Sequence, residues 1–399
     1  MMEANRAALG PRVFDDVRVL DFTGVIAGPY CTRMMADLGA DVLKVEPPSG
    51  ELMRHIAPMR GDESTVFASL NCGKRSLVLD LKQPAAVAIC KLLVASYDVV
   101  VENFSPGVMR RLGLGYEDLV AENPRLIMCS ISGYGQTGPG AERPAFAPIV
   151  QALSGFDLVT LANQPGLDRP LNMGLPVADT TASQQAFGAI SAALYYRART
   201  GIGQYIDIAM LDSLVSTMHR DFQAAFHPDR IDRLYGPIAA RDGFLILMPL
   251  TQSQFTELCL ALGRPDLQDD PRFASMRARL DNYNALMAIA EQWAHTRTVS
   301  EAVRVLETAG IPCAPYRSVN ECADDPQLHH RGMLTEVVDA AGPLKVPNTP
   351  FLYSATQAAI RPEVATLGQH SHAVLGQELE LPAHDIEALV AAGVTNPLA

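Results

Sequence analysis

The chain has 399 residues, of which 48% are hydrophobic and 19% charged, and its formal net charge is −12. This length exceeds one ordinary domain, and the composition supplies apolar side chains for more than one core, which excludes a disordered or fibrous protein. The acidic balance argues against a nucleic-acid partner, because nucleic acids favour a basic face.

The first half of the chain alternates between strand and helix patterns. Strands are predicted over residues 17–22, 41–46, 76–81, 98–102 and 126–131, and helices over 30–38, 84–96 and in two short pieces ending at Glu122. This alternation is typical of an α/β domain with a mostly parallel sheet. Right-handed crossovers bring the carboxyl ends of such strands to one rim, where ligands bind. The predicted rim comprises residues 23–27, those from Pro47 onward, 80–82, 103–105 and 132–135.

The second half is predicted to contain a smaller α/β unit. A long alanine-rich helix over 179–199 is followed by a strand over 205–209, a helix over 211–226 and a linker over 227–242. A strand over 244–248 and a helix over 252–262 come next. Leu286, Ile289, Ala290 and Trp293 form a core-facing helical stripe, and a capping box from Thr298 to Glu301 opens another helix that Gly310 ends. From about residue 330 the chain is loop-rich until a closing helix over 385–392.

Compartment and metal content are also predicted from the sequence. The first residues lack an apolar segment of signal-peptide length, and no apolar run approaches ~18 residues. The 7 cysteines form no CxxC pair and are typical of reduced core residues. No zinc-site spacing accompanies His329-His330 or His370-x-His372. We therefore expect a cytoplasmic protein that binds neither a membrane, nor nucleic acid, nor a metal.

The segment Gly133-Tyr-Gly-Gln-Thr-Gly138 matches GxGxxG and follows a predicted strand. A dinucleotide site needs a helix that begins there and receives the pyrophosphate at its amino terminus. Pro139, Gly140 and Pro144 follow within the next residues and prevent a long helix. The segment is interpreted as a glycine-rich loop, and an NAD(P)-dependent oxidoreductase remains an alternative.

Asp179 lies directly before the predicted long helix. Most aspartates at such a position are N-caps, but a carboxylate kept ionised by the helix dipole can also be a covalent nucleophile. Position alone leaves both roles open. Basic side chains near the rim are either solvated surface charges or ligands of phosphate groups: Lys74, Arg75, Lys82, Arg110 and Arg111.

Ordered motifs along most of the chain resemble class III CoA-transferases, the relatives of formyl-CoA transferase and carnitine CoA-transferase. α-Methylacyl-CoA racemases share this fold. The opening motifs lie at residues 19–23 (VLDFT), 27–29 (AGP), 38–42 (LGADV) and 44–46 (KVE). The resemblance continues through residues 71–76, 79–82, 101–104, 106–107, 111–113, 132–135 and 200–204.

The resemblance implies a Rossmann-like large domain with a parallel sheet, a smaller α/β domain and an interlocked homodimer. The large CoA-binding domain would combine residues 11–205 with 330–399, and the small domain would span 225–325. Asp179 matches the nucleophilic aspartate of the family. Contacts with coenzyme A are implied at Ile26, Ala27, Leu79, Asp80, Leu81, Lys82, Asn103, Phe104, Ser105 and Arg111.

Three departures from formyl-CoA transferase are visible. Pro47 stands where that enzyme has a phosphate-binding arginine, so another cation must hold the phosphate. Ile26 replaces an active-site glutamine, which leaves only backbone donors at this position. The glycine-rich loop that covers the active site has no counterpart, and a segment around Tyr235-Gly236-Pro237 would have to exclude water instead.

The sequence therefore predicts an enzyme that moves CoA from an acyl-CoA to a free carboxylic acid through a mixed anhydride and an aspartyl-CoA thioester on Asp179. Backbone N–H groups near Ile26 and Ala27 are our hypothesis for an oxyanion hole. A racemase would need a histidine, but Phe146-Ala147-Pro148 at that place holds no titratable group. A catalytically inactive binding module is a further alternative, and the donor and acceptor acids stay open.

Overall fold

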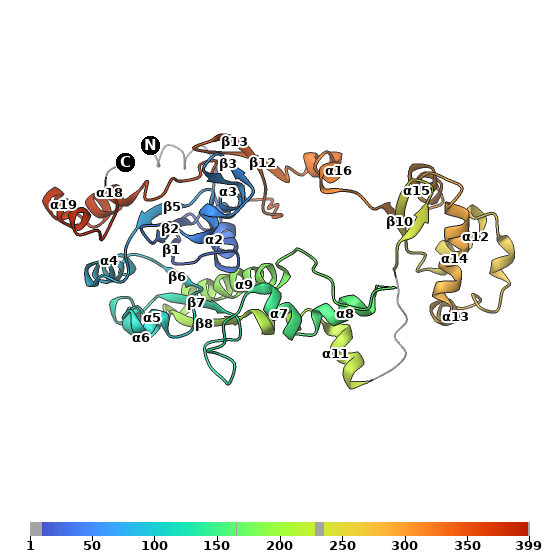
Figure 1. Cartoon of the computed structure of the whole chain (residues 1–399), viewed down its shortest axis with the longest axis horizontal. Helices are drawn as coiled ribbons and strands as arrows, with labels where there is room; N and C mark the ends of the chain where they lie inside the picture. The colour runs from blue at the N-terminus through green and yellow to red at the C-terminus, as the bar shows by residue number, and fades with distance from the viewer. Residues whose placement is uncertain (1–9, 165, 228–234, 398–399) are drawn as a thin grey trace. The chain divides into compact units, whose positions relative to one another are not determined.

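The computed structural model describes residues 10–164, 166–227 and 235–397 of the chain (Figure 1). It divides into two compact units. Unit 1 comprises Met1–His219 and His329–Ala399, and unit 2 comprises Arg220–Leu328. The division into domains at 11–205, 225–325 and 330–399 stays a prediction. In the described part of the chain, no helix has the length and apolar character needed to cross a membrane.

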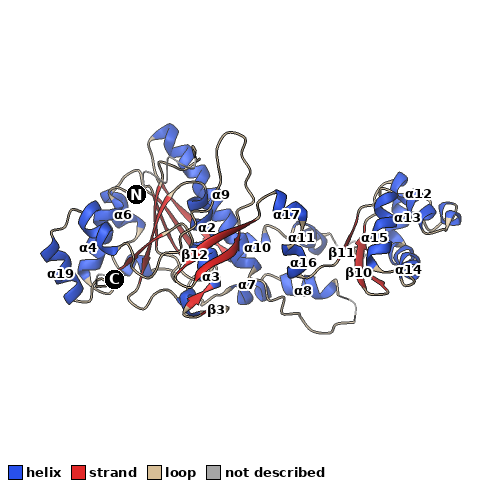
Figure 2. Ribbon diagram, turned by 90° about the horizontal axis from the view of Figure 1, so that it is seen from above, coloured by secondary structure: helices blue, strands red, loops and turns tan. Residues whose placement is uncertain are grey.

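A 6-stranded sheet forms the centre of unit 1, in the order β5-β2-β1-β6-β7-β8 (Figure 1). Figure 2 shows its strands in red, between helices such as α4 and α9. Every neighbouring pair is parallel, which confirms the predicted parallel sheet. The strand order reverses between β1 and β6, where open sheets form a ligand crevice. The strands are β1 (Arg18–Asp21), β2 (Asp41–Glu46), β5 (Arg75–Val78), β6 (Val99–Glu102), β7 (Ile127–Ser132) and β8 (Gln204–Ala209).

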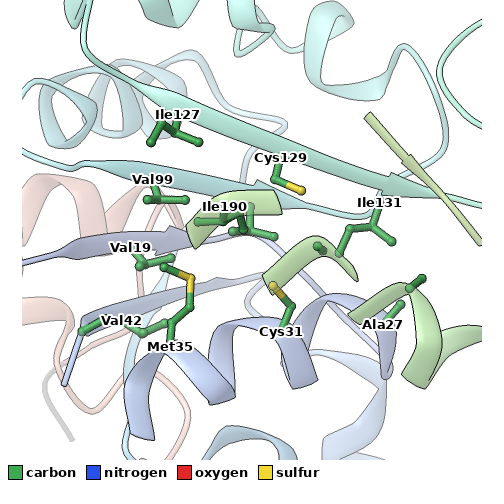
Figure 3. Packing of buried hydrophobic residues seen from close by; sticks show 14 of the residues in the cluster. Val19, Ala27, Cys31, Met35, Val42, Val99, Ile127, Cys129, Ile131 and Ile190 are labelled. Atoms are coloured by element: carbon green, nitrogen blue, oxygen red, sulfur yellow. The ribbon is translucent and has the colours of Figure 1, made fainter. Parts of the chain in front are cut away.

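Helices cover both faces of this sheet, because alternate strand side chains are apolar on each face. One face packs against α2 (Ala27–Asp37), α7 (Ala147–Leu153), α9 (Val177–Thr200) and α10 (Met210–Val215). Figure 3 shows this core, where Val19 and Val99 of the sheet lie near Met35 of α2 and Ile190 of α9. The other face packs against α4 (Pro84–Val94), α6 (Tyr116–Glu122), η3 (Val374–Glu378) and α19 (Ala383–Ala391).

Two predictions outside the central sheet are wrong in detail. The helix expected over 211–226 is two helices, because α10 ends at Val215 and α11 spans His219–Phe226. The region after residue 330 contains an antiparallel hairpin of β12 (Leu334–Asp339) and β13 (Gly342–Pro347). Val337 and Val346 of the hairpin pack on α3 (Thr65–Asn71). The two segments are far apart in the sequence, so no local sequence pattern predicts this contact. The smaller elements are η1 (Leu52–His55), β3 (Met59–Arg60), β4 (Glu63–Ser64), α5 (Val108–Arg111), α8 (Phe156–Ala162), α17 (Pro326–His330) and α18 (Ser371–Ala373).

Unit 2 combines a 3-stranded antiparallel sheet with helices. Its strands are β9 (Ile238–Ala240), β10 (Gly243–Leu247) and β11 (Cys313–Pro315). β9 lies inside the predicted linker over 227–242, whose residues 228–234 are outside the described part of the chain. The capping box of Thr298 and Glu301 is confirmed. The helices are α12 (Gln252–Ala261), η2 (Pro265–Gln268), α13 (Met276–Asp281), α14 (Tyr283–Ala294), α15 (Val299–Thr308) and α16 (Val319–Ala323).

Candidate active site

Asp21, at the end of β1, anchors the loop that follows the strand. Its buried carboxylate accepts hydrogen bonds from the Thr23 N–H (2.9 Å), the Thr32 hydroxyl (2.7 Å) and the Lys74 ammonium (3.1 Å). Burial alone would raise the pKa of Asp21, but the ammonium groups of Lys74 and Lys44 hold it well below its ordinary value. Lys44 also donates to the Thr23 carbonyl (2.6 Å). The backbone at Thr23 is therefore fixed from several sides.

Asn103, directly after β6, holds the next part of this loop. Its side-chain oxygen accepts from the Gly24 N–H (2.9 Å), and its amide group donates to the Gly24 carbonyl (2.8 Å). Val25 has a φ of 65°, a region that β-branched residues avoid. The Val25 N–H donates to the carboxylate of Glu51 (3.2 Å). Two side chains from distant segments thus hold a strained turn, which is typical of functional sites.

The turn leads into α2, which begins at Ala27 with Ile26 as its N-cap residue. Gly28 is required here, because a Cβ atom at this residue would lie 2.2 Å from the Cβ atom of Thr23. The N-cap has no side-chain hydrogen bond to the helix, so the first backbone N–H groups of α2 are not capped by its side chain. Such N–H groups can stabilise an oxyanion, as hypothesised for Ile26 and Ala27.

Ser183 connects the start of α2 to the start of α9. Its hydroxyl oxygen lies 2.6 Å from the carbonyl oxygen of Ala27 and 2.7 Å from that of Asp179. Ser183 is fully buried, and Ala27, Ala178 and Ala182 belong to the same core. The structure therefore brings Asp179 together with Ile26 and Ala27, although about 150 residues separate them in the sequence.

The expectation that Asp179 precedes the helix is wrong. α9 begins at Val177 with Pro176 as its N-cap residue, so Asp179 lies in the first turn. The helix starts earlier because Ala178 packs into the core, and the side chain of Gln151 accepts from the Ala178 N–H (3.5 Å). Asp179 is therefore not an N-cap. Among the described residues, none forms a hydrogen bond with its carboxylate, which leaves both oxygens available to a substrate.

Burial raises the pKa of Asp179 from 3.8 to about 6. If the ionised carboxylate attacks the acyl-CoA, kcat/KM for the acyl-CoA should fall about tenfold per pH unit below this pKa and be constant above it. We expect a midpoint at about pH 6, because burial of the Asp179 carboxyl group raises its pKa to about this value. Stopped-time assays of CoA transfer across about pH 4.5–8.5 test this. A midpoint at about pH 4, the ordinary range of aspartate, would contradict it.

Glu102, at the end of β6, provides the control for this pH profile. It is buried, it accepts a hydrogen bond from the Phe104 N–H (2.8 Å), and burial raises its pKa to about 7. Glu102→Gln keeps the hydrogen-bond acceptor and removes the titrating group. The acidic limb should remain at about pH 6 in this variant if it belongs to Asp179. Loss of the limb would assign it to Glu102 instead.

The other predicted CoA contacts divide into three groups. Asn103, Phe104 and Ser105 follow β6 and lie beside the loop after β1. Leu79 is buried in the core, so only its backbone could contact coenzyme A. The backbone carbonyl of Asp80 accepts a hydrogen bond from the Gln83 N–H (2.9 Å). These two residues, with Leu81 and the exposed Lys82, follow β5 at the sheet edge, two strands away from β1. Arg111 is exposed at the end of α5.

Two of the basic side chains near the rim are neither solvated surface charges nor available phosphate ligands. Lys74 is buried against Asp21, and Arg75 pairs with Asp41 (2.8 Å) and Glu378. Both side chains therefore stabilise the fold and are not available to phosphate groups. Lys82, Arg110 and Arg111 are exposed. Arg54, which follows Pro47, does not replace the missing arginine either, because both oxygens of Glu46 hold it (2.7 and 2.8 Å).

The segment matching GxGxxG is a loop, as predicted, since the next helix, α7, begins only at Ala147. Gly133 packs closely on Ala145. A Cβ atom added at Gly133 would lie only 2.2 Å from the Cβ atom of Ala145. Across the described residues, no group of three or more potential metal ligands is found. His370 accepts from the Ser76 N–H through Nδ1 (3.2 Å), an ordinary structural contact.

Sequence reasoning missed three residues of the site. They are Glu51, which fixes Val25, and Ser183 and Gln151, which position the first turn of α9. The spacing of Ser183 from Asp179 places both on one helix face and could have indicated the link. Glu51 and Gln151 act from elements that no local pattern connects to Asp179.

Comparison with known proteins decides between the alternatives. Residues 14–371 match the model of CoA-transferase family III. The chain belongs to this family. It is a class III CoA-transferase, and neither the oxidoreductase nor the racemase alternative is favoured.

Relatives of this chain carry names that specify several different acids. Succinyl-CoA:glutarate CoA-transferase of Mus musculus is 34% identical over 393 residues, 95% of this chain and 89% of the relative. Acetyl-CoA:oxalate CoA-transferase of Acetobacter aceti is 37% identical over 352 residues, 86% of this chain and 89% of the relative. Succinyl-CoA:mesaconate CoA-transferase of Haloarcula hispanica is 39% identical over 347 residues, 81% of this chain and 85% of the relative.

Solved structures of this family share the α/β fold. A CaiB/BaiF family protein from Brucella suis superposes with a TM-score of 0.79 at 32% identity, over 92% of this chain and 99% of that protein. Rv3272 from Mycobacterium tuberculosis gives a TM-score of 0.80 at 31% identity, over 91% of this chain and 98% of that protein.

Proposed function

We propose that this transferase moves CoA from an acyl-CoA thioester to a free carboxylic acid through covalent intermediates on Asp179. The observation that carries the proposal is the placement of Asp179. Its half-buried carboxylate lies in the first turn of α9, and Ser183 ties that turn to the start of α2. The helix turn that carries the nucleophile is therefore tied to the helix start that carries the proposed N–H donors, an arrangement that suits acyl transfer.

In the first half-reaction, the Asp179 carboxylate attacks the thioester carbonyl and the CoA thiolate leaves, which forms a mixed anhydride. The thiolate then attacks the Asp179 carbonyl of the anhydride. The donor acid departs with the bridging oxygen, and an aspartyl-CoA thioester remains. Each tetrahedral intermediate carries a negative charge on oxygen, and the N–H groups at Ile26 and Ala27 stabilise it.

The second half-reaction reverses these steps with the acceptor acid. Its carboxylate attacks the aspartyl-CoA carbonyl, and the thiolate leaves again. The thiolate then attacks the acceptor carbonyl of the new anhydride, which releases the product acyl-CoA and regenerates the Asp179 carboxylate. No net proton transfer is needed. Burial suits this chemistry, because it keeps water from the anhydride and makes the carboxylate of Asp179 more basic.

Coenzyme A would lie along the rim of the sheet in this proposal, at Ile26, Ala27 and the residues after β5 and β6. Lys82 and Arg111 are the exposed cations of the proposed site and are assigned to its phosphate groups. The segment 235–237 remains our candidate for excluding water. We further propose an interlocked homodimer in the cytoplasm. The relatives that act on glutarate, oxalate and mesaconate make short dicarboxylic acids the first acceptors to test.

A kinetic experiment tests this function. Acyl-CoA donors are incubated with a panel of carboxylic acids, and CoA products are resolved by mass. New acyl-CoA should form only when an acceptor acid is present, with ping-pong kinetics. In deuterated water the α-carbon of an α-methylacyl-CoA should stay unlabelled, because the chemistry occurs at the carbonyl. Rapid α-deuteration without an acceptor would instead support the racemase, which must exchange this proton.

A further inference from the structure

Unit 2 contains a small hollow whose lining includes a single cationic side chain. It is bordered by the end of β10, by α13 and by the start of α14, and its lining includes Leu250, Met276, Arg279 and Tyr283. Its free volume is about 30 Å³, room for about two water molecules or one carboxylate group. The rim is apolar and exposed, since Leu250 is 44% and Met276 56% accessible. A small opening thus combines apolar walls with one cation.

Arg279 is the unusual member of this hollow. Its side chain is only 6% exposed and stacks over the ring of Phe255 (4.7 Å). One guanidinium nitrogen, Nη1, donates to the side chain of Gln252 (2.8 Å) and to the Phe273 carbonyl (3.1 Å). Within the described part of the chain, no carboxylate lies within ion-pair distance of Arg279, and Nε and Nη2 have no hydrogen-bond acceptor.

A buried guanidinium without an anion is costly to a fold, and most buried charges are therefore paired. Two other buried cations of the chain do face a carboxylate, since Lys74 lies against Asp21 and Arg75 against Asp41. Tyr283 adds a second donor at the hollow, because its hydroxyl oxygen accepts from the Tyr235 N–H (3.2 Å) and its own proton remains free to donate. The two groups together match the hydrogen-bonding pattern of a carboxylate.

We propose that this hollow is a binding site for a carboxylic acid with a short hydrocarbon chain, held by Arg279 and Tyr283. The carboxylate would neutralise the charge of Arg279, and the hydrocarbon chain of the ligand would cover Leu250 and Met276. A phosphate fits less well, because it is larger and more strongly hydrated than the apolar rim allows. The site goes beyond the transfer reaction as proposed above, since Arg279, Tyr283, Leu250 and Met276 belong to unit 2 and have no role in the steps at Asp179. Tyr235, which also lines the hollow, is shared with the segment proposed to exclude water.

Calorimetry on the full-length chain tests the ligand class. The Asp179→Asn variant is used so that no turnover contributes heat, and the result does not depend on the proposed mechanism. Pentanoate should bind in a saturable manner, and pentanamide, its neutral analogue, should bind at least about tenfold more weakly. Inorganic phosphate should not compete. Equal binding of pentanamide, competition by phosphate, or no binding of pentanoate up to about 10 mM would overturn the proposal.

Two further variants locate the binding. Arg279→Met should lower the affinity for pentanoate at least about tenfold, whereas Arg279→Lys should retain part of it. Arg277→Met is the matched control, because Arg277 lies on the same helix, has a side chain that is 82% exposed, and pairs with Asp281. It should bind pentanoate as the parent does. Unchanged affinity for pentanoate in Arg279→Met would refute the site. If Arg279→Met fails to fold, Arg279→Lys takes its place, and unchanged affinities for pentanoate and pentanamide in that variant would refute the site equally.

Discussion

Asp179→Ala and Asp179→Asn are expected to lower kcat for CoA transfer by at least about 10³-fold. Both variants lack the oxygen nucleophile that forms the anhydride, and Asn cannot replace it because its amide is far less nucleophilic. The measurement is the rate of acyl-CoA formation from a competent donor and acceptor, with the background rate without enzyme subtracted. Turnover within about tenfold of the parent would mean that another group forms the intermediate.

Thermal unfolding separates this loss from misfolding. A carboxyl group whose pKa is higher in the folded than in the unfolded protein destabilises the fold above its folded pKa and has no effect below its unfolded pKa. Burial raises the pKa of Asp179 to about 6, so Asp179→Asn should melt no lower than the parent at neutral pH. Asp385→Ala is the matched control for activity, because Asp385 lies in the first turn of α19 and is exposed. It should transfer CoA normally.

Gly28→Ala is expected to lower kcat/KM by about 10²-fold and to destabilise the fold by about 1–3 kcal/mol. The added Cβ atom would lie 2.2 Å from both the Cβ and Cγ2 atoms of Thr23. Thr23 cannot move aside, because Asp21 and Lys44 hold its backbone. The start of α2 must therefore shift, and Ile26 and Ala27 shift with it. Steady-state kinetics and the melting temperature measure the two effects.

Gly188→Ala is the control for the glycine substitution. Gly188 lies on an exposed face of α9, and no atom lies within 4 Å of a Cβ added there. The change should leave activity intact and stabilise the helix by about 0.5–1 kcal/mol. If Gly28→Ala behaved like Gly188→Ala, the close approach of α2 to the loop after β1 would have no role in the site.

The parallel sheet could be predicted because its strands and helices carry strong local patterns. The buried strand over 98–102, for example, contains a short apolar run between two predicted helices. Such runs and the helical periodicity on either side of them predict these elements well. β9 and the hairpin of β12 and β13 could not be predicted in this way. Their strands are short or half exposed, so local sequence alone does not stabilise them. β9 is held by its pairing with β10, and the hairpin by its own pairing and by its contact with the distant α3.

The candidate site was predicted only in part. Asp179 came from its resemblance to a family motif, since its position near a helix start equally allowed an N-cap. The charge of Lys74 did not reveal that the side chain is buried against Asp21, because burial depends on packing between separate segments. The same limit applies to Ser183, whose contact with Ala27 exists only in the folded chain.

Isotope transfer to Asp179 tests the central claim most directly. The enzyme is incubated with an acyl-CoA and an acceptor acid whose carboxylate carries a heavy oxygen isotope, and the peptide that contains Asp179 is then analysed by mass spectrometry. The proposed reaction leaves one oxygen of the acceptor in the Asp179 carboxylate in every cycle, so this peptide should gain one heavy oxygen after a single turnover and up to two after many. Product formation without any label in this peptide would show that the acid never forms an anhydride with Asp179, and would contradict the account.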